Sequence, residues 1–160
     1  MLPLRYHSEL LAEAVELSIS YGGNTVCEGV CFTIMRGDRV ALRGGNGSGK
    51  TSIIRLLRGE KLSYRGCLKV GASLKISSVH QDLSALRGSL REYAARLGVD
   101  ESIFKANLRK LELPRELFER DISTFSAGQR KKTAIAVSLS EQAHLYLWDE
   151  PLNYIDVVSR

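Results

Sequence analysis

The sequence of 160 residues has few cysteines, no long apolar run and no low-complexity segment. Its three cysteines, Cys27, Cys31 and Cys67, form no C-x-x-C pair, and an odd number argues against a disulfide framework. We expect them to be small buried side chains within strands. The uncharged apolar stretches are too short to span a bilayer, and charged residues interrupt the leucines near the N-terminus, which argues against a signal peptide. These absences favour a cytoplasmic protein whose chain has no transmembrane segment.

Hydrophobic residues make up 44% of the chain and charged residues 26%, which is typical of a soluble globular protein. The length suits one domain with its own core or an incomplete part of a larger one. Lysine and arginine exceed aspartate and glutamate by 23 to 18, so the net charge is +5. This excess is compatible with an RNA-rich or phosphate partner and also with a solvated helical face. Much of it lies in Arg109–Lys110, Arg115, Arg120 and Arg130–Lys132.

A glycine-rich stretch fits the phosphate-binding pattern G-x-x-x-x-G-K-[ST]. In such a loop the backbone N–H groups turn inward and the following helix N-terminus adds partial positive charge, so phosphate oxygens are the natural ligand. Lys50 is expected to reach the β- and γ-phosphates of a nucleotide, and Thr51 to bind a Mg²⁺ ion that bridges them. The alternative is a glycine-rich turn that binds nothing. The predicted nucleotide-binding residues here are Gly44, Gly45, Asn46, Gly47, Ser48, Gly49, Lys50, Thr51 and Ser52.

The residues around this loop have the order of strand, loop and helix that such a site requires. Residues 39–43 are strand-like. Residues 52–58 place isoleucines and leucines at helical spacing before Gly59, which suits a helix C-cap. The flanking pattern therefore favours a phosphate loop over an empty turn.

Alternating apolar residues upstream of the loop predict an antiparallel β-hairpin. They occupy residues 15–20 and 30–34, and the turn residues Gly22-Gly23-Asn24 lie between them. Tyr21 stands beside this turn, at the expected edge of the sheet, where its ring could stack on a nucleotide base or simply pack.

Downstream of the loop, the pattern predicts two short strands, a group of helices and a final strand. Ser89 begins a capping box, and Ser126 is expected to cap the last helix. An apolar run at 144–148 is expected to be a buried parallel strand. The other strands are expected at 66–70 and 74–79, and the helices at 89–97, 100–111, from Pro114 onward and at 126–140. The inward side chains of the last helix are expected to be Ala134, Ile135, Val137 and Leu139.

Two acidic residues follow the final strand directly. Asp149 is expected to hold Mg²⁺ opposite Thr51, and Glu150 to polarise an attacking water. Gln81, at the end of another predicted strand, has an amide suited to contacting the metal or that water. These residues and Lys50 could together position a nucleotide and neutralise its charge, which are the main requirements of nucleotide hydrolysis. Without the phosphate loop, an acidic turn after a strand is the simpler interpretation.

The segment Phe125–Gln129 resembles the signature motif of ATP-binding cassette (ABC) proteins, whose usual form is Leu-Ser-Gly-Gly-Gln. Ser126, Gly128 and Gln129 match this form, whereas Phe125 and Ala127 depart from it. The resemblance implies that the serine hydroxyl and the helix N-terminus contact the γ-phosphate of an ATP bound by a second cassette. A single chain would then hold two half-sites.

The resemblance extends over nearly the whole chain. It identifies Tyr21 as the adenine-stacking aromatic, Gln81 as the Q-loop, Asp149–Glu150 as the Walker B acids and Asn153–Asp156 as the D-loop. It implies an α/β P-loop NTPase (RecA-like) fold with an N-terminal antiparallel β subdomain and a small helical subdomain. The expected domain is a single incomplete ABC ATPase cassette over 1–160, truncated after the D-loop. Its core would occupy about 13–80 and 141–160, and the helical subdomain with the signature about 83–140.

Within the family, residues 144–156 and the preceding Gln129–Lys132 resemble the second cassette of ABC-F proteins, in particular the antibiotic-resistance branch that acts on the ribosome. Only 44 residues separate Gln81 from Ser126, so the long coiled coil of chromosome-maintenance ATPases has no room. The resemblance implies binding of ATP and Mg²⁺, and hydrolysis when the cassette is complete and paired. The ribosome or its RNA is the implied partner.

Two alternatives come from other classes of protein. Complete cassettes carry a switch histidine after the D-loop, and none of His7, His80 and His144 matches that position. The chain could therefore bind a nucleotide without hydrolysing it. It could also be the ATPase subunit of a membrane transporter.

Overall fold

The computed structural model describes residues 4, 6–84 and 86–151. The predicted D-loop, residues 153–156, lies outside the described residues. The chain divides into two compact units, each described by itself below. Unit 1 comprises Met1–Ile76 and Ala143–Leu147, and unit 2 comprises Ser77–Gln142 and Trp148–Arg160.

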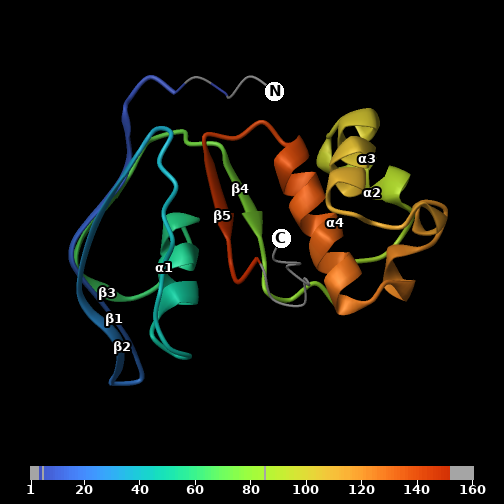
Figure 1. The fold of residues 1–160 in the computed structure, drawn as a ribbon. Coiled ribbons are helices and arrows are strands. Elements are labelled where there is room, and N and C mark those ends of the chain that lie inside the picture. The colour runs from blue at the N-terminus through green and yellow to red at the C-terminus, as the bar shows by residue number, and fades with distance from the viewer. Residues whose placement is uncertain (1–3, 5, 85, 152–160) are drawn as a thin grey trace, which may run out of the picture. The chain divides into compact units, whose positions relative to one another are not determined.

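Unit 1 contains a three-stranded antiparallel sheet in the order β2-β1-β3 (Figure 1). Its strands are β1 (Leu10–Tyr21), β2 (Asn24–Met35) and β3 (Tyr64–Val70). Gly22 and Gly23, at φ 54° and 86°, join β1 to β2 in the left-handed conformation that tight hairpins need. The predicted hairpin is confirmed. Because β1 is the central strand, Tyr21 lies at a strand end rather than at the predicted edge of the sheet.

Helix α1 (Lys50–Leu57) follows the glycine-rich loop and packs in the core of unit 1. Its apolar residues bury against β1 side chains such as Leu17 and Ile19, both fully buried. The helix ends at Arg58, and Gly59 follows at φ 83° with its N–H bonded to the carbonyl of Leu56. The predicted helix and its terminating glycine are therefore confirmed.

The strand predicted just before the loop is absent. Residues 38–45 form neither helix nor strand, and Val40 and Leu42 are 55% and 38% exposed. A strand requires a neighbour that accepts its backbone hydrogen bonds, and no described strand pairs with this segment. The apolar pattern of residues 39–43 is compatible with a strand. Whether a strand forms depends on backbone hydrogen bonds to a neighbouring strand, which the pattern does not contain.

Strands β4 (Ile76–Val79) and β5 (Leu145–Trp148) form a separate two-stranded sheet. The His144 N–H donates to the Lys75 carbonyl (2.8 Å) and the Asp149 N–H to the Val79 carbonyl (3.3 Å). Both partners advance in the same direction along the chain, so the strands are parallel. The predicted parallel strand followed by acidic residues is confirmed.

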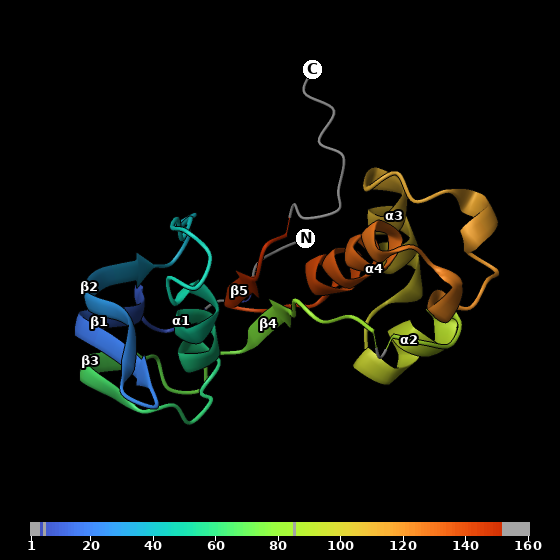
Figure 2. The same cartoon turned by 90° about the horizontal axis from the view of Figure 1, so that it is seen from below.

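The described residues of unit 2 form three helices and two short 3₁₀ turns (Figure 2). The helices are α2 (Leu90–Leu97), α3 (Glu101–Lys110) and α4 (Ala127–Ser140), and the turns are η1 (Arg115–Leu117) and η2 (Ile122–Thr124). The capping box predicted at Ser89 begins α2, and the N-cap predicted at Ser126 begins α4, where the structure shows a second capping box. Buried side chains from all three helices and both turns share one core: Leu90, Tyr93, Ala94, Phe104, Leu108, Leu113, Leu117, Ile122, Phe125, Ala136 and Val137.

Three smaller predictions are wrong. The segment after Pro114 is only the 3₁₀ turn η1, a form suited to short connections. Leu139 is 37% exposed, although Ala134, Ile135 and Val137 are buried as expected. Cys31 and Cys67 are exposed and Cys27 is half-buried, because they lie on the outer strands β2 and β3, which have fewer neighbours than β1.

Candidate nucleotide-binding site

The glycine-rich loop depends on glycine at two positions for steric reasons. Gly49 has φ 83°, and a Cβ there would lie 3.1 Å from the Cβ of Cys27 and 3.4 Å from the carbonyl of Val26. A Cβ on Gly44 would lie 2.5 Å from the Oγ of Ser48. The loop therefore approaches both β2 and its own Ser48 too closely for any side chain.

Polar groups in this loop suit an anionic ligand. The N-cap residue Gly49 gives α1 no side-chain cap, so the N–H groups of the first turn can bind an external acceptor. The Oγ of Ser48 is buried and has no hydrogen-bond partner in the described part of the chain. The Lys50 ammonium donates to the carbonyls of Gly44 (2.9 Å) and Gly45 (2.7 Å). These two bonds hold its charge over the loop and leave a third N–H for a ligand.

Tyr21 lies next to the helix that follows the loop. Its hydroxyl donates to the Oγ of Ser52 (3.0 Å), a buried residue in the first turn of α1. The Tyr21 residue is nevertheless 42% exposed. Thr51, between Lys50 and Ser52, is exposed as well. Unit 1 thus brings together the predicted base-stacking residue and the predicted phosphate-binding residues.

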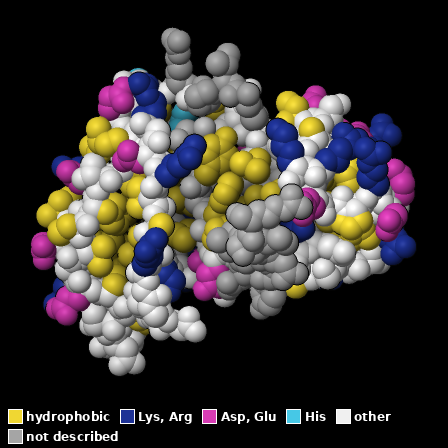
Figure 3. Space-filling view, viewed as in Figure 1, with side chains coloured by type: hydrophobic (Ala, Val, Ile, Leu, Met, Phe, Trp, Pro, Cys, Tyr) yellow, Lys and Arg dark blue, Asp and Glu magenta, His cyan; other side chains and the backbone are white. Residues whose placement is uncertain are grey.

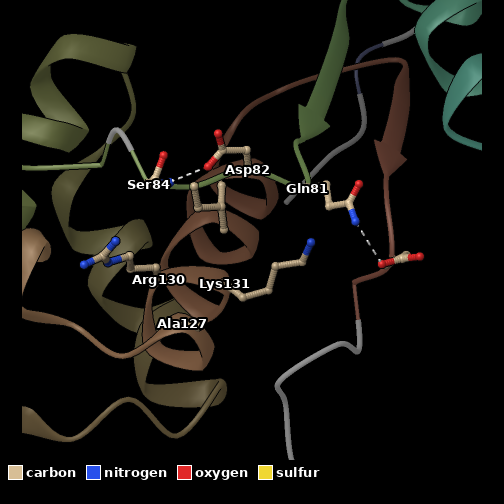
Figure 4. Close-up of a pocket in the computed structure, with 8 residues that line it drawn as sticks. Gln81, Asp82, Ser84, Ala127, Arg130 and Lys131 are labelled. Carbon is tan, nitrogen blue, oxygen red and sulfur yellow. Dashed lines mark hydrogen bonds between the residues drawn. The ribbon is translucent and has the colours of Figure 1, made fainter.

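The predicted catalytic acid and its neighbours lie in unit 2, around the ends of β4 and β5. Asp149 is buried, at 5% exposure. The Gln81 amide donates to the Glu150 carboxylate at the long distance of 3.5 Å. Glu150 has φ 47°, a left-handed conformation uncommon outside glycine. Gln81 and Glu150 line a cavity of about 280 Å³, shown in Figure 4.

Lys131 also lines this cavity. In the sequence it is one of three consecutive basic residues, and no separate role was predicted for it. Its ammonium donates to the backbone carbonyl of Asp149 (2.7 Å) and the residue is only 4% exposed. Burial lowers the pKa of Lys131, while the neighbouring charges of Asp149 and Glu150 oppose that shift. Helical spacing could have revealed it: Lys131 is three and four residues before Ala134 and Ile135, on the same predicted inward face.

The signature segment begins α4. The Ser126 Oγ accepts from the Gln129 N–H (3.2 Å), and the Gln129 side chain accepts from the Ser126 N–H (2.9 Å). Ser126 is exposed, and accepting this bond leaves its O–H free to donate. Gly128 lies in the first turn between them. The N-terminus of α4 therefore presents a hydroxyl donor together with the partial positive charge of the helix.

The described residues contain no group of three or more His, Cys, Asp and Glu side chains that could hold a metal ion. Protein sites usually bind Mg²⁺ through one or two carboxylates plus substrate phosphates. Asp149 and the Thr51 hydroxyl are oxygen donors of this kind. The Nδ1 of His144 is already occupied, because it accepts a hydrogen bond from the Lys75 N–H (2.8 Å).

Several of the basic residues noted in the sequence lie on an exposed surface of unit 2. Lys and Arg side chains appear there among acidic ones in Figure 3. Arg109, Lys110, Arg115 and Arg120 are exposed, and so are Glu112, Glu116 and Glu119, with which they alternate along the chain. Interleaved signs favour a solvated face over a binding surface for nucleic acid.

Comparison with known proteins decides the family. The family model described as "ABC transporter" matches residues 27–153. The chain belongs to this family. It is an ABC ATPase domain, and the predicted resemblance, fold class and enzyme class are confirmed. No helix in the described part of this ABC domain has the length and apolar character needed to cross a membrane.

The relatives of this ABC domain include proteins from bacteria and from a plant. It is 30% identical to the ATP-binding protein Uup of Caulobacter vibrioides, covering 92% of this chain and 26% of that protein. It is also 30% identical to the lantibiotic transport ATP-binding protein SrtF of Streptococcus pyogenes (89% of this chain, 67% of SrtF). ABC transporter F family member 4 of Arabidopsis thaliana is 29% identical (93% and 22%). The chain thus spans between about a fifth and two thirds of these relatives.

Among solved structures, one similar chain occurs in the complex of the archaeal ribosomal stalk protein aP1 with the archaeal ribosome recycling factor aABCE1. The match has a TM-score of 0.76 and 28% identity, and covers 98% of this chain and 30% of that chain. The two ABC folds therefore agree over nearly the whole length of the present chain.

Proposed function

We propose that this chain binds ATP with Mg²⁺ and, paired with a second cassette, hydrolyses it to drive a conformational change in a cytoplasmic ABC-F protein that acts on the ribosome. The observation that carries the nucleotide assignment is the loop of unit 1. It combines an uncapped helix N-terminus, a buried Ser48 Oγ without a described partner, and the Lys50 ammonium held over the loop. Each of these groups gains a partner when phosphate oxygens bind.

In this proposal the N–H groups of Gly47, Gly49 and Lys50 bind the phosphates, and Lys50 neutralises the charge on the β- and γ-phosphates. The other loop residues, Gly44, Gly45, Asn46, Ser48, Thr51 and Ser52, complete this binding surface. Tyr21 stacks its exposed ring on the adenine, which such stacking stabilises by about 1–3 kcal/mol in comparable base–aromatic contacts.

Mg²⁺ would be held by Thr51 and Asp149, with Gln81 nearby, and would neutralise charge on the phosphate oxygens. Glu150 orients the attacking water and accepts its proton. The Gln81 amide donates a hydrogen bond to the Glu150 carboxylate and helps to hold it in place. Ser126, Gly128 and Gln129 at the start of α4 serve the γ-phosphate of the ATP bound by the second cassette. Two cassettes therefore complete each other's sites.

The direct test is phosphate release by the full-length protein carrying Glu150→Gln. The amide keeps the size of the side chain but cannot accept the proton of the water, so turnover should fall at least about 100-fold while ATP still binds. Lys50→Ala should instead abolish ATP binding. Unchanged turnover in Glu150→Gln contradicts the role of Glu150, and tight ATP binding without turnover in the unmodified protein favours a binding module only.

The ribosome assignment rests on two supports. Residues 144–156 resemble the second cassette of ABC-F proteins. The similar proteins include ABC transporter F family member 4 and a chain from the complex of the archaeal ribosomal stalk protein aP1 with the ribosome recycling factor aABCE1. The test is ATP-dependent co-sedimentation of full-length Glu150→Gln protein with ribosomes. A protein that does not co-sediment with ribosomes in any nucleotide state contradicts this assignment. The same result contradicts membership of the antibiotic-resistance branch.

A second candidate function is the ATPase subunit of a membrane transporter. It is supported by the relative SrtF, of which the chain covers 67%. Co-purification of the full-length protein with membrane-spanning subunits, and no ribosome binding, is the result that favours it. A first cassette encoded upstream in the same reading frame favours ABC-F instead.

A further inference from the structure

Helix α4 is tied to the ends of β4 and β5 by two buried polar contacts within unit 2. Near its C-terminus, the Ser138 Oγ bonds to the Ser77 Oγ (2.6 Å) and accepts from the Trp148 indole N–H (2.9 Å). Seven residues earlier, on the same face, the Lys131 ammonium donates to the Asp149 carbonyl (2.7 Å). Only the second contact reaches the peptide that joins the two acidic residues.

This second contact restrains the backbone next to Glu150, whose conformation is uncommon for a residue other than glycine. The oxygen that Lys131 binds belongs to the peptide plane between Asp149 and Glu150, and that plane sets the direction in which Glu150 leaves the strand. A left-handed φ of 47° at a non-glycine residue costs roughly 1–2 kcal/mol and persists only when its surroundings hold it. Contacts that hold this conformation include the Lys131 bond, the bond from the Asp149 N–H to Val79 and the weak Gln81 contact.

Burying an ammonium group also needs a reason. Lys131 is 4% exposed, whereas its neighbour Lys132 is half-buried and its side chain forms no hydrogen bond or ion pair with a described residue. An exposed lysine would avoid the desolvation cost that Lys131 pays. Figure 4 shows the Lys131 and Gln81 side chains pointing toward the same part of the cavity.

From this geometry we infer that Lys131 is a positioning residue for hydrolysis: by holding the Asp149 carbonyl it fixes the Glu150 carboxylate and links that carboxylate to α4, the helix that the signature begins. The inference rests on the proposed function, because it assigns Lys131 a part in the same reaction. A shift of α4 when the second cassette binds would reach the catalytic acid through this bond.

The experiment compares Lys131→Met with Ser138→Ala in the full-length protein. Both break a buried contact between α4 and the strand ends, but only Lys131→Met releases the Asp149–Glu150 peptide. For Lys131→Met we expect kcat to fall on the order of 10- to 100-fold, with the Kd for ATP changed less than about twofold. Ser138→Ala should keep its kcat, Lys132→Met should match the unmodified protein, and Lys131→Arg should recover part of the loss.

Amide hydrogen exchange gives a readout that does not need turnover. Lys131→Met should speed exchange of the segment that contains Asp149 and Glu150 at least about tenfold, whereas Ser138→Ala should not. Equal losses of kcat in Lys131→Met and Ser138→Ala would overturn the inference, because they would indicate a purely structural contact. Unchanged exchange at Asp149 and Glu150 in Lys131→Met would do the same. If the unmodified protein hydrolyses no ATP, the proposed function fails, and the exchange result still decides whether Lys131 restrains the acid.

Discussion

Two residues to which the proposed function assigns a role, Gly49 and Glu150, have a left-handed backbone conformation. At Gly49 the conformation is reached with glycine because a Cβ would contact Cys27 and Val26. At Glu150 a side chain is needed for the reaction, so the backbone strain remains and neighbouring bonds hold it. The motif spacing predicted the first position, whereas the second depends on bonds to residues far away in the sequence.

Gly49→Ala and Gly59→Ala form a matched pair, since both residues have φ 83° and flank the same helix. Each should lower the free energy of unfolding by about 1 kcal/mol through backbone strain. A Cβ at Gly59 has nothing within 4 Å, whereas one at Gly49 meets β2. Only Gly49→Ala should therefore weaken ATP binding, by at least about tenfold in a fluorescent-nucleotide titration. Equal affinities in the two variants would mean that the loop tolerates the displacement.

Helices α2 and α4 begin with the same local device but are expected to do different work. Both have a serine at the N-cap and a Glu or Gln three residues later, and both form a capping box. The short pattern was sufficient to predict these caps, because all the atoms involved lie within four residues of one another. Only the cap of α4 coincides with the signature motif.

Ser89→Ala and Ser126→Ala separate capping from catalysis. Each should cost about 1 kcal/mol of unfolding free energy, measured by urea denaturation, because each removes one N-cap acceptor. In the paired full-length protein, only Ser126→Ala should reduce ATP turnover, by about tenfold or more, since its hydroxyl also serves the partner's ATP. An equal fall in turnover for Ser89→Ala would indicate a loss of stability alone.

For the whole molecule, the proposed function assigns the phosphate loop and the signature to different ATP molecules, so catalysis would need a second cassette. The loop with Tyr21 belongs to unit 1, and the signature with Gln81, Asp149 and Glu150 belongs to unit 2. The predicted partition of 1–160 into core and helical subdomains stays a prediction. So do the assigned roles of the individual site residues.

ATP should therefore drive pairing when hydrolysis is blocked. In sedimentation velocity, we expect the mass of the Glu150→Gln chain to double with ATP and Mg²⁺ but not with ADP, because only ATP places a γ-phosphate between loop and signature. Adding Ser126→Ala to this variant should weaken the pair. A Glu150→Gln chain that binds ATP and stays single at all concentrations contradicts pairing between two copies of this chain.

The sequence by itself determined the features whose cause is local. The glycine spacing of the loop, the β1–β2 hairpin, the two capping boxes and the acids after β5 could all be predicted, because each depends on residues that are close along the chain. The family resemblance added membership of the ABC family, which the comparison with known proteins confirmed.

The tertiary structure decided everything that depends on a distant partner. Residues 39–43 have the pattern of a strand but no described strand pairs with them. Cys31 lies on an outer strand and is exposed. Lys131 belongs to a run of three basic residues, yet it is buried. It binds the carbonyl of Asp149, which lies 18 positions further along the chain. Burial and long-range hydrogen bonds are properties of packing, and a local pattern does not contain them.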